Sequence, residues 1–190
     1  ARYPAPKGWT PTGGWRVDRS LVFAHALQES RFRADVTSHA GAKGLMQVMP
    51  GTARQMAAQR GEAVGSLNAP SVNLEYGQTY IEHLRDLGET GGLLPKVIAA
   101  YNAGPTPIGK WNLRMRDNAD PLMYIESMPY WETRAYVTII LRNYWMYQQK
   151  DGKKADSLSA MAQGMWPRFP GLSGATAVRL DGAGRVQSAD

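Results

Sequence analysis

The sequence predicts a fold that is nearly all helical, either all-α or an α+β fold in which helices dominate. Apolar residues recur at three- and four-residue spacing over several stretches, which is the period of one helix face. Glycine and proline separate these stretches, and no convincing alternation of apolar and polar residues predicts a strand. The length of 190 residues, with 43% hydrophobic and 20% charged residues, allows one globular domain with a sizeable core.

The N-terminal part of the chain is expected to hold an extended arm followed by two helices. Residues 1–16 contain three prolines and no helical period, so they predict an extended entry arm. Asp18 is a suitable N-cap for a first helix that runs to about Ser30. A shorter helix is expected over residues 50–60, and Gly61 is expected to end it.

The middle of the chain predicts two further helices and a loop. Asn73 is expected to cap a third helix, and Gly77 lies inside it at a cost of about 1 kcal/mol relative to alanine. A close crossing with another helix would account for that glycine. A fourth, nearly uncharged helix over residues 93–100 ends near Gly104. Residues 105–119 are polar and basic, and they predict a loop.

The C-terminal part predicts a capped short helix and then the longest helix. Asp120 precedes a proline, which indicates an N-cap and a helix to about Met128. The longest helix is expected over residues 133–149.

Three segments follow from this pattern. The body is expected over residues 17–150, after the entry arm of residues 1–16. Residues 151–190 are expected to form a C-terminal extension. Its apolar residues within 157–170 would dock, whereas the small and polar residues after 171 predict a weakly ordered tail.

Charge limits the partners only broadly. The formal net charge of +6 and the pI near 9.7 favour anionic partners, but a solvated basic surface explains them equally well. Lys and Arg are dispersed and no recognition motif accompanies them, so no nucleic-acid partner is expected. Cysteine is absent, which excludes disulfides and thiol nucleophiles.

Other classes of site and segment are not indicated by the sequence. No run approaches the roughly 20 apolar residues of a membrane span, so no transmembrane segment is expected. His25, His39 and His83 lie far apart without metal-ligand spacing. We therefore expect no metal and no cofactor. The chain begins with Ala1 and is interpreted as a piece of a longer protein.

Glu29 is the residue whose position suggests chemistry. It lies at the end of the first expected helix, where the helix dipole disfavours a carboxylate, and burial beside Phe32 would act in the same direction. Both effects would raise the pKa of its carboxyl group, which suits a general acid. An ordinary glycoside hydrolase needs a second carboxylate, and the spacing of Asp35, Glu126 and Glu132 selects none of them. An exposed glutamate in a last helical turn would have the same local pattern, so these residues alone leave the role open.

Several sequence blocks together resemble one enzyme family. They are QESRF at residues 28–32, SHAGA at 38–42, GLMQVMP at 44–50 with Thr52 and Ala53, AYNAG at 100–104, and YWETRAYV at 130–137. In order and separation they are similar to the soluble lytic transglycosylases of bacteria. The resemblance covers about residues 15–148.

The resemblance implies a lysozyme-like helical domain with a cleft for the glycan strand of peptidoglycan. Glu29 would be the sole catalytic carboxylate, first protonating the glycosidic oxygen between N-acetylmuramic acid and N-acetylglucosamine. It would then take the proton from the muramoyl 6-hydroxyl, which attacks its own C1. The product would be a 1,6-anhydromuramoyl end, formed without water.

The resemblance also implies substrate-binding residues. Ser38 would bond near the N-acetyl group, and Gln47 and Met49 would line the cleft. Tyr101 would orient Glu29 or the sugar, and Glu132 would be a secondary carboxylate that positions substrate.

Two alternatives remain beside the lytic transglycosylase. One is a muramidase similar to goose lysozyme, which would use water and a second acid such as Asp35 or Glu132. The other is a catalytically silent wall-binding module. The expected partners are peptidoglycan glycan strands, with an upstream helical domain or other cell-wall enzymes also open, and the expected location is the periplasm. Exo or endo cleavage and the biological setting are not predicted.

Overall fold

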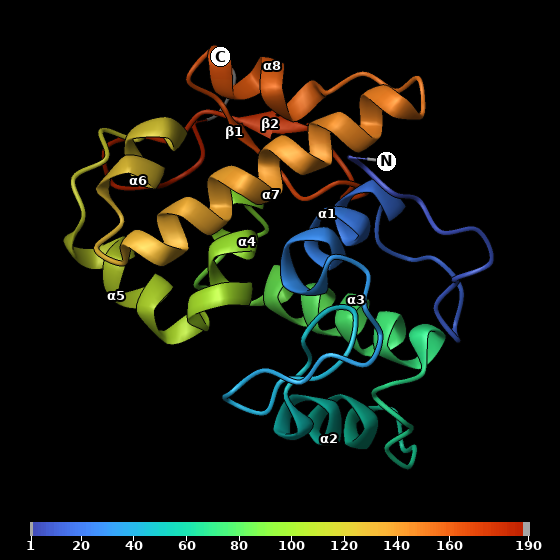
Figure 1. Cartoon of the computed structure of the whole chain (residues 1–190). Helices are drawn as coiled ribbons and strands as arrows, with labels where there is room; N and C mark the ends of the chain where they lie inside the picture. The colour runs from blue at the N-terminus through green and yellow to red at the C-terminus, as the bar shows by residue number, and fades with distance from the viewer. Residues whose placement is uncertain (1, 188–190) are drawn as a thin grey trace. The chain divides into compact units, whose positions relative to one another are not determined.

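The computed structural model of the chain describes residues 2–187 (Figure 1). They form two compact units, one extending to Glu82 and the other starting at His83. In chain order the elements are α1 (Arg19–Ser30), α2 (Pro50–Gln59), α3 (Pro70–Asp86), α4 (Leu94–Ala103), α5 (Pro105–Arg114), α6 (Pro121–Ser127), α7 (Trp131–Lys150), α8 (Asp156–Ala162), β1 (Trp166–Pro167) and β2 (Ala177–Val178). The prediction of a helix-dominated fold is confirmed.

Helix α1 forms where the sequence predicts it. Asp18 Oδ1 accepts a hydrogen bond from the Ser20 backbone N–H at 2.8 Å, which caps the start of the helix. Residues 21–26 are all buried, as expected for a helix with few charges. The hydroxyl of Ser30, the last residue of α1, donates to the Leu45 carbonyl at 2.8 Å. This bond fixes the end of α1 to the loop that follows.

Asn73 lies inside α3, so the prediction that it caps this helix is wrong. The helix starts at Pro70, a residue favoured at the first helical position, and no asparagine cap is needed there. The Asn73 side chain instead supports a loop: its Oδ1 accepts from the Met46 N–H, and its Nδ2 donates to the carbonyls of Lys43 and Leu67, each at 2.8 Å. Asn73 is fully buried. One side chain therefore fixes the backbone over residues 43–46.

Gly77 leaves space for a loop side chain. The atoms nearest to a Cβ built at this position all belong to Met46, and that Cβ would overlap the methionine sulfur. The prediction of a close helix crossing at Gly77 is therefore wrong, because the buried Met46 side chain takes this space.

The N-terminal arm is attached to α3 through a buried carboxylate. Glu75 is 4% exposed. It accepts from the Arg16 guanidinium at 2.7 Å and from the Gly13 N–H at 2.9 Å. Gln78, one helical turn along, accepts from the Arg16 backbone N–H at 3.0 Å. The arm thus has fixed polar contacts although it contains no helix within its described residues.

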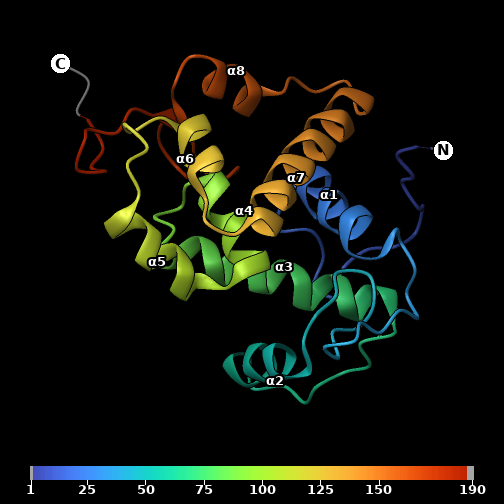
Figure 2. The ribbon, with the colours of Figure 1, turned by 60° about the vertical axis from the view of Figure 1, so that its left-hand side comes forward.

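In the second unit, α4 packs against both α7 and α5 (Figure 2). Ile98 of α4 and Ile140 of α7 are fully buried. Helix α7 begins two residues earlier and ends one residue later than the predicted helix over 133–149. This pair of helices forms the core on which α5 and α6 are placed.

Helix α5 occupies most of the segment predicted as a loop over residues 105–119, so that prediction is wrong for this part. Gly104, with φ at 80°, ends α4 as predicted. Pro105 then takes the first position of α5, where its missing N–H costs no helical hydrogen bond. Ile108 and Trp111, three residues apart, are buried and anchor the helix. The same Gly-Pro pair therefore ends one helix and starts the next.

Asp120 caps α6, as predicted. Its Oδ1 accepts from the backbone N–H groups of Leu122 at 2.8 Å and Met123 at 3.0 Å. Just before it, the Ala119 carbonyl accepts a hydrogen bond from the indole N–H of Trp166 at 2.7 Å. The segment leading into α6 is thereby tied to β1.

The segment after α7 docks within the second unit. Met161, Trp166 and Phe169 are each at most 2% exposed, and β1 pairs antiparallel with β2. Two-residue strands are too short to produce an alternating pattern, which explains why the sequence did not predict them. Residues 188–190 of the C-terminal extension lie outside the described residues, and the weak order of the segment after 171 remains a prediction.

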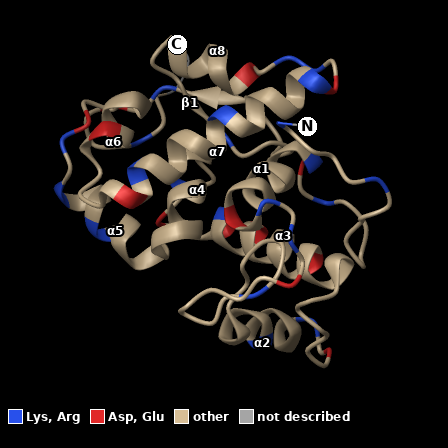
Figure 3. Ribbon diagram, in the orientation of Figure 1, with Lys and Arg blue, Asp and Glu red and all other residues tan. Residues whose placement is uncertain are grey.

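Charged residues are scattered over the elements of both units. Figure 3 shows Lys and Arg interspersed with Asp and Glu along the ribbon rather than gathered on one helix. None of the helices formed by residues 2–187 combines the length and the apolar character needed to cross a bilayer.

Candidate functional site

Glu29 lies in the last turn of α1 and is half-buried. It lines a surface hollow of about 330 Å³ together with Gln28, Ser30, Arg31 and Arg33. Among the residues described around this hollow, Glu29 is the acidic one. The end of α1 is well defined, because Arg31 closes it in the left-handed conformation at φ 53° and the Ser30 hydroxyl is bonded to the neighbouring loop. The carboxylate is therefore carried by a fixed helix end.

Ser38 sits in a tight turn that its own side chain helps to form. The Ser38 N–H donates to the Ala42 carbonyl at 2.8 Å, and the Ser38 hydroxyl accepts from the Ala42 N–H at 3.0 Å. A hydroxyl that accepts one bond keeps its own hydrogen to donate. The half-buried Ser38 can thus hold the turn and still donate to a ligand.

Gln47 braces the loop between Ser38 and α2. Its Nε2 donates to the carbonyls of Val36 at 3.2 Å and Gly44 at 3.0 Å. These bonds hold the backbone of Gln47 at φ 49°, a left-handed conformation that residues other than glycine seldom adopt. Met49 is the N-cap residue of α2 and is 42% exposed. The structure therefore brings Ser38 and Gln47 into one hydrogen-bonded loop and leaves Met49 at its surface.

The other two predicted site residues belong to the second unit. Tyr101 is half-buried on α4, and Glu132 is exposed in the first turn of α7. A carboxylate in a first turn is favoured by the helix dipole, which gives Glu132 a local structural role as well. Their neighbours in sequence are joined, because Thr133 donates to Asn102 Oδ1 at 2.7 Å. The AYNAG segment and the start of α7 are thus joined by a hydrogen bond.

A hollow of about 450 Å³ opens at this junction. It is lined by Asn102, Ala103, Pro129, Tyr130, Trp131, Glu132 and Thr133. Of these residues, Glu132 is predicted from the sequence as a site residue, whereas Trp131 and Tyr130 are not. The sequence does not predict that these two side chains are exposed, because aromatic side chains are more often buried.

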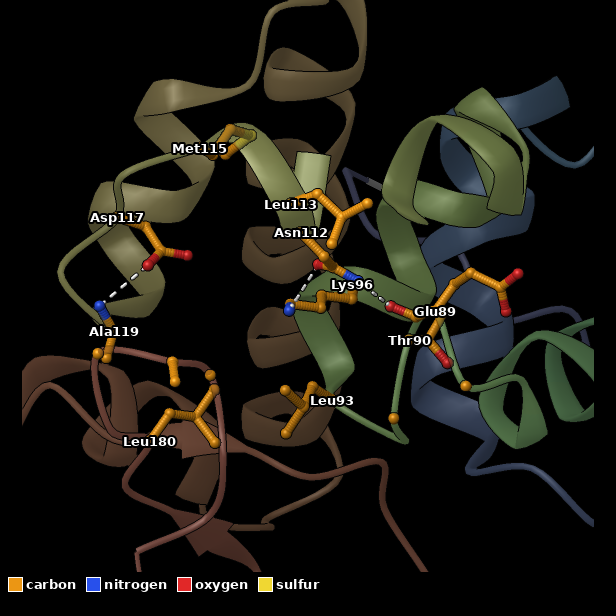
Figure 4. A pocket seen from close by; sticks show the side chains of 15 residues that line it. Glu89, Thr90, Leu93, Lys96, Asn112, Leu113, Met115, Asp117, Ala119 and Leu180 are labelled. Atoms are coloured by element: carbon orange, nitrogen blue, oxygen red, sulfur yellow. Dashed lines mark hydrogen bonds between the residues drawn. The ribbon is translucent and has the colours of Figure 1, made fainter. Parts of the chain in front are cut away.

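A separate cavity of about 350 Å³ contains none of the predicted site residues (Figure 4). Lys96 lies on its wall and donates to Asn112 Oδ1 at 2.8 Å. Its ammonium group also lies 5.1 Å from the ring centroids of both Tyr124 and Trp166. Burial lowers the pKa of Lys96, and the negative charge of Asp117 partly opposes that effect. Lys96 thereby joins α4 to α5, α6 and β1, which is a structural role.

Among residues 2–187, no group of three or more His, Cys, Asp or Glu side chains is placed to hold a metal ion.

The comparisons with known proteins define the class of protein. Residues 11–123 match the family described as Transglycosylase SLT domain. This match covers more than half of the chain, so the chain belongs to that family. Glu29, Ser38, Gln47, Met49 and Tyr101 lie within the matched residues, and Glu132 lies beyond them.

Particular relatives agree with this assignment. The soluble lytic murein transglycosylase of Escherichia coli (strain K12) is 32% identical over 157 residues, which are 80% of this chain and 24% of the relative. The crystal structure of the 70 kDa soluble lytic transglycosylase from Escherichia coli has a TM-score of 0.71 and 33% identity, covering 83% of this chain and 25% of that chain. The chain therefore spans about a quarter of the length of these relatives.

A second solved structure is that of an inactive glutamate-to-glutamine mutant of the lytic transglycosylase Slt from Pseudomonas aeruginosa. It has a TM-score of 0.65 and 36% identity, covering 71% of this chain and 22% of that chain. At these identities the likeness extends beyond the fold to the family.

Proposed function

We propose that this chain is a lytic transglycosylase that cleaves the β-1,4 bond between N-acetylmuramic acid and N-acetylglucosamine in peptidoglycan. The observation that carries the proposal is the match to the Transglycosylase SLT domain over residues 11–123, which includes Glu29. Action on murein in the periplasm is part of this proposal.

In the proposed mechanism, Glu29 acts first as an acid and then as a base. Its carboxyl proton goes to the glycosidic oxygen, and the bond from that oxygen to C1 of the muramoyl residue breaks. The resulting carboxylate takes the proton of the muramoyl 6-hydroxyl, whose oxygen forms the new bond to C1. Glu29 ends protonated, as it began, and no water is consumed. This balance requires a single carboxylate, in contrast to the two of ordinary glycosidases.

Three local features support this use of Glu29. It sits on a fixed helix end, it borders a hollow, and it is the acidic side chain among the residues described around that hollow. The inactive relative from Pseudomonas aeruginosa carries a glutamine in place of a glutamate, so a glutamate is required in that enzyme.

The remaining residues would bind and orient the glycan. We propose that the Ser38 hydroxyl donates to the sugar N-acetyl region while it holds its turn, and that Gln47 and Met49 line the glycan path. Tyr101 would orient the acid or the sugar, and Glu132 would accept hydrogen bonds from sugar hydroxyls. These groups position substrate and transfer no proton in the mechanism.

The proposal is tested with Glu29→Gln and with Glu126→Gln as a matched control on an exposed carboxylate of α6. Release of soluble muropeptides from purified sacculi should fall by about 10²- to 10⁴-fold for Glu29→Gln, since glutamine cannot exchange the proton. Glu126→Gln should release them at the parent rate. Equal loss in both variants, or full activity of Glu29→Gln, would contradict the proposal.

A further inference from the structure

The start of α7 presents two aromatic side chains to solvent. Trp131 is 78% exposed and Tyr130 is 51% exposed. Tryptophan is usually well covered in folded proteins because its large ring gains much from leaving water. Both rings border the hollow that also contains Glu132 and Asn102. An exposed indole at the edge of a hollow that also holds polar side chains is a feature that a ligand would cover.

The backbone that carries these rings is held in place. The Tyr130 ring packs edge-on against the buried Trp111 of α5, with centroids 5.1 Å apart and planes at 89°. Two residues beyond Trp131, the buried Thr133 donates to Asn102 Oδ1 at 2.7 Å. The indole therefore projects from a segment fixed to both α4 and α5. A ligand that covers it has little backbone ordering to supply.

The composition of the hollow selects a class of ligand. None of the described residues that line it is Lys or Arg, and Glu132 contributes a negative charge. A phosphate or carboxylate ligand is therefore disfavoured. A neutral pyranose fits, because one ring face carries only C–H groups, which pack on an aromatic plane, while the hydroxyls around its edge can reach acceptors. Glu132 and Asn102 are such acceptors on the same hollow.

We propose that Trp131 is a stacking platform for one N-acetylhexosamine ring of the glycan strand, flanked by Tyr130. This inference rests on the proposed function, because the glycan strand is the ligand assigned there. It adds a further sugar-binding position to the residues discussed above. Trp131 determines affinity for the polymer and takes no part in proton transfer.

The inference is tested by binding in a chain that carries Glu29→Gln, so that turnover does not obscure it. The probe is a chito-oligosaccharide of N-acetylglucosamine, with titration calorimetry and indole fluorescence as readouts. Adding Trp131→Ala should weaken binding by at least about tenfold, and Trp131→Phe should retain most of the affinity. Leu113→Ala is the matched control, since Leu113 is 88% exposed on the neighbouring α5. Circular dichroism should show that all variants keep their helices.

The outcomes separate this inference from the function on which it rests. If the unmodified chain digests sacculi but Trp131→Ala binds the probe as well as its parent, the stacking role is wrong and the proposed function stands. If the chain releases no muropeptides but Trp131→Ala loses probe binding, the stacking role stands and the enzymatic proposal falls. No binding of the probe to the parent, or equal losses for Leu113→Ala and Trp131→Ala, also contradicts the stacking role.

Discussion

At the scale of single residues, the loop that carries Ser38 and Gln47 depends on one asparagine. Replacing Asn73 by alanine removes its three hydrogen bonds and leaves the Met46 N–H and the Leu67 carbonyl without them. We expect Asn73→Ala to lower the free energy of unfolding by about 2–4 kcal/mol. The exposed Asn68 on the preceding turn gives the control, Asn68→Ala, which should cost less than about 0.5 kcal/mol. Urea unfolding measures both, and equal midpoints would contradict the role of Asn73.

The burial of His25 predicts that the stability of the chain depends on pH. Burial lowers the pKa of His25 to about 4, and the Leu21 carbonyl, which accepts from its ring N–H, offsets this only in part. The folded chain therefore binds this proton less well than the unfolded chain. Stability is fully present above the unfolded value near 6.5 and declines as pH falls toward 4, by up to about 3 kcal/mol.

The pH dependence of unfolding tests this prediction. His25→Gln should flatten the stability profile between pH 6.5 and 4, whatever its effect on stability at neutral pH. His39→Gln, which changes an exposed histidine, is the matched control variant. An unchanged slope in His25→Gln would show that another group titrates in this range.

Among the elements, the N-terminal arm should stay attached to α3, because the ion pair between Arg16 and Glu75 joins them. Burial alone would raise the pKa of Glu75, but its hydrogen bonds with Arg16, Gly13, Gln78 and Arg60 outweigh burial and lower it. The stabilisation is therefore present above the ordinary value of 4.5 and is lost as pH falls below it.

Arg16→Met should lower the free energy of unfolding at neutral pH by about 1–3 kcal/mol, a range reduced because the Arg16 side chain is 35% exposed. Lys7→Met changes an exposed residue of the same arm and should have little effect. Proteolysis should cleave the arm faster in Arg16→Met than in the parent. Equal cleavage rates would mean that the arm is attached by other contacts.

The elements also show what the sequence could and could not predict. Asp18 and Asp120 were predicted as caps because a cap acts within three residues of its own position. Asn73 was misassigned because its partners lie up to 30 residues away. Helix α5 was missed because a proline just after a helix-ending glycine is typical of a loop, although Pro105 also suits the first position of the next helix.

For the whole molecule, the sequence blocks that resemble the family predicted the helical fold class. They also predicted the family to which the comparisons assign the chain. The same blocks predicted the site residues, which are Glu29, Ser38, Gln47, Met49, Tyr101 and Glu132. The sequence does not indicate that Trp131 is exposed, since exposure depends on how α5 and α7 pack. Periodicity and caps record local constraints, whereas the surroundings of a side chain depend on residues distant in the sequence.

In the proposed function, Glu29 carries out an intramolecular transglycosylation. The most direct test is mass spectrometry of muropeptides released from purified peptidoglycan in water enriched in heavy oxygen. Attack by the muramoyl 6-hydroxyl predicts muramoyl ends that are lighter by one water than hydrolysis products and free of the heavy isotope, and Glu29→Gln should form none. Reducing ends that carry heavy oxygen would contradict it, because they would show that water, and not the muramoyl 6-hydroxyl, attacks C1.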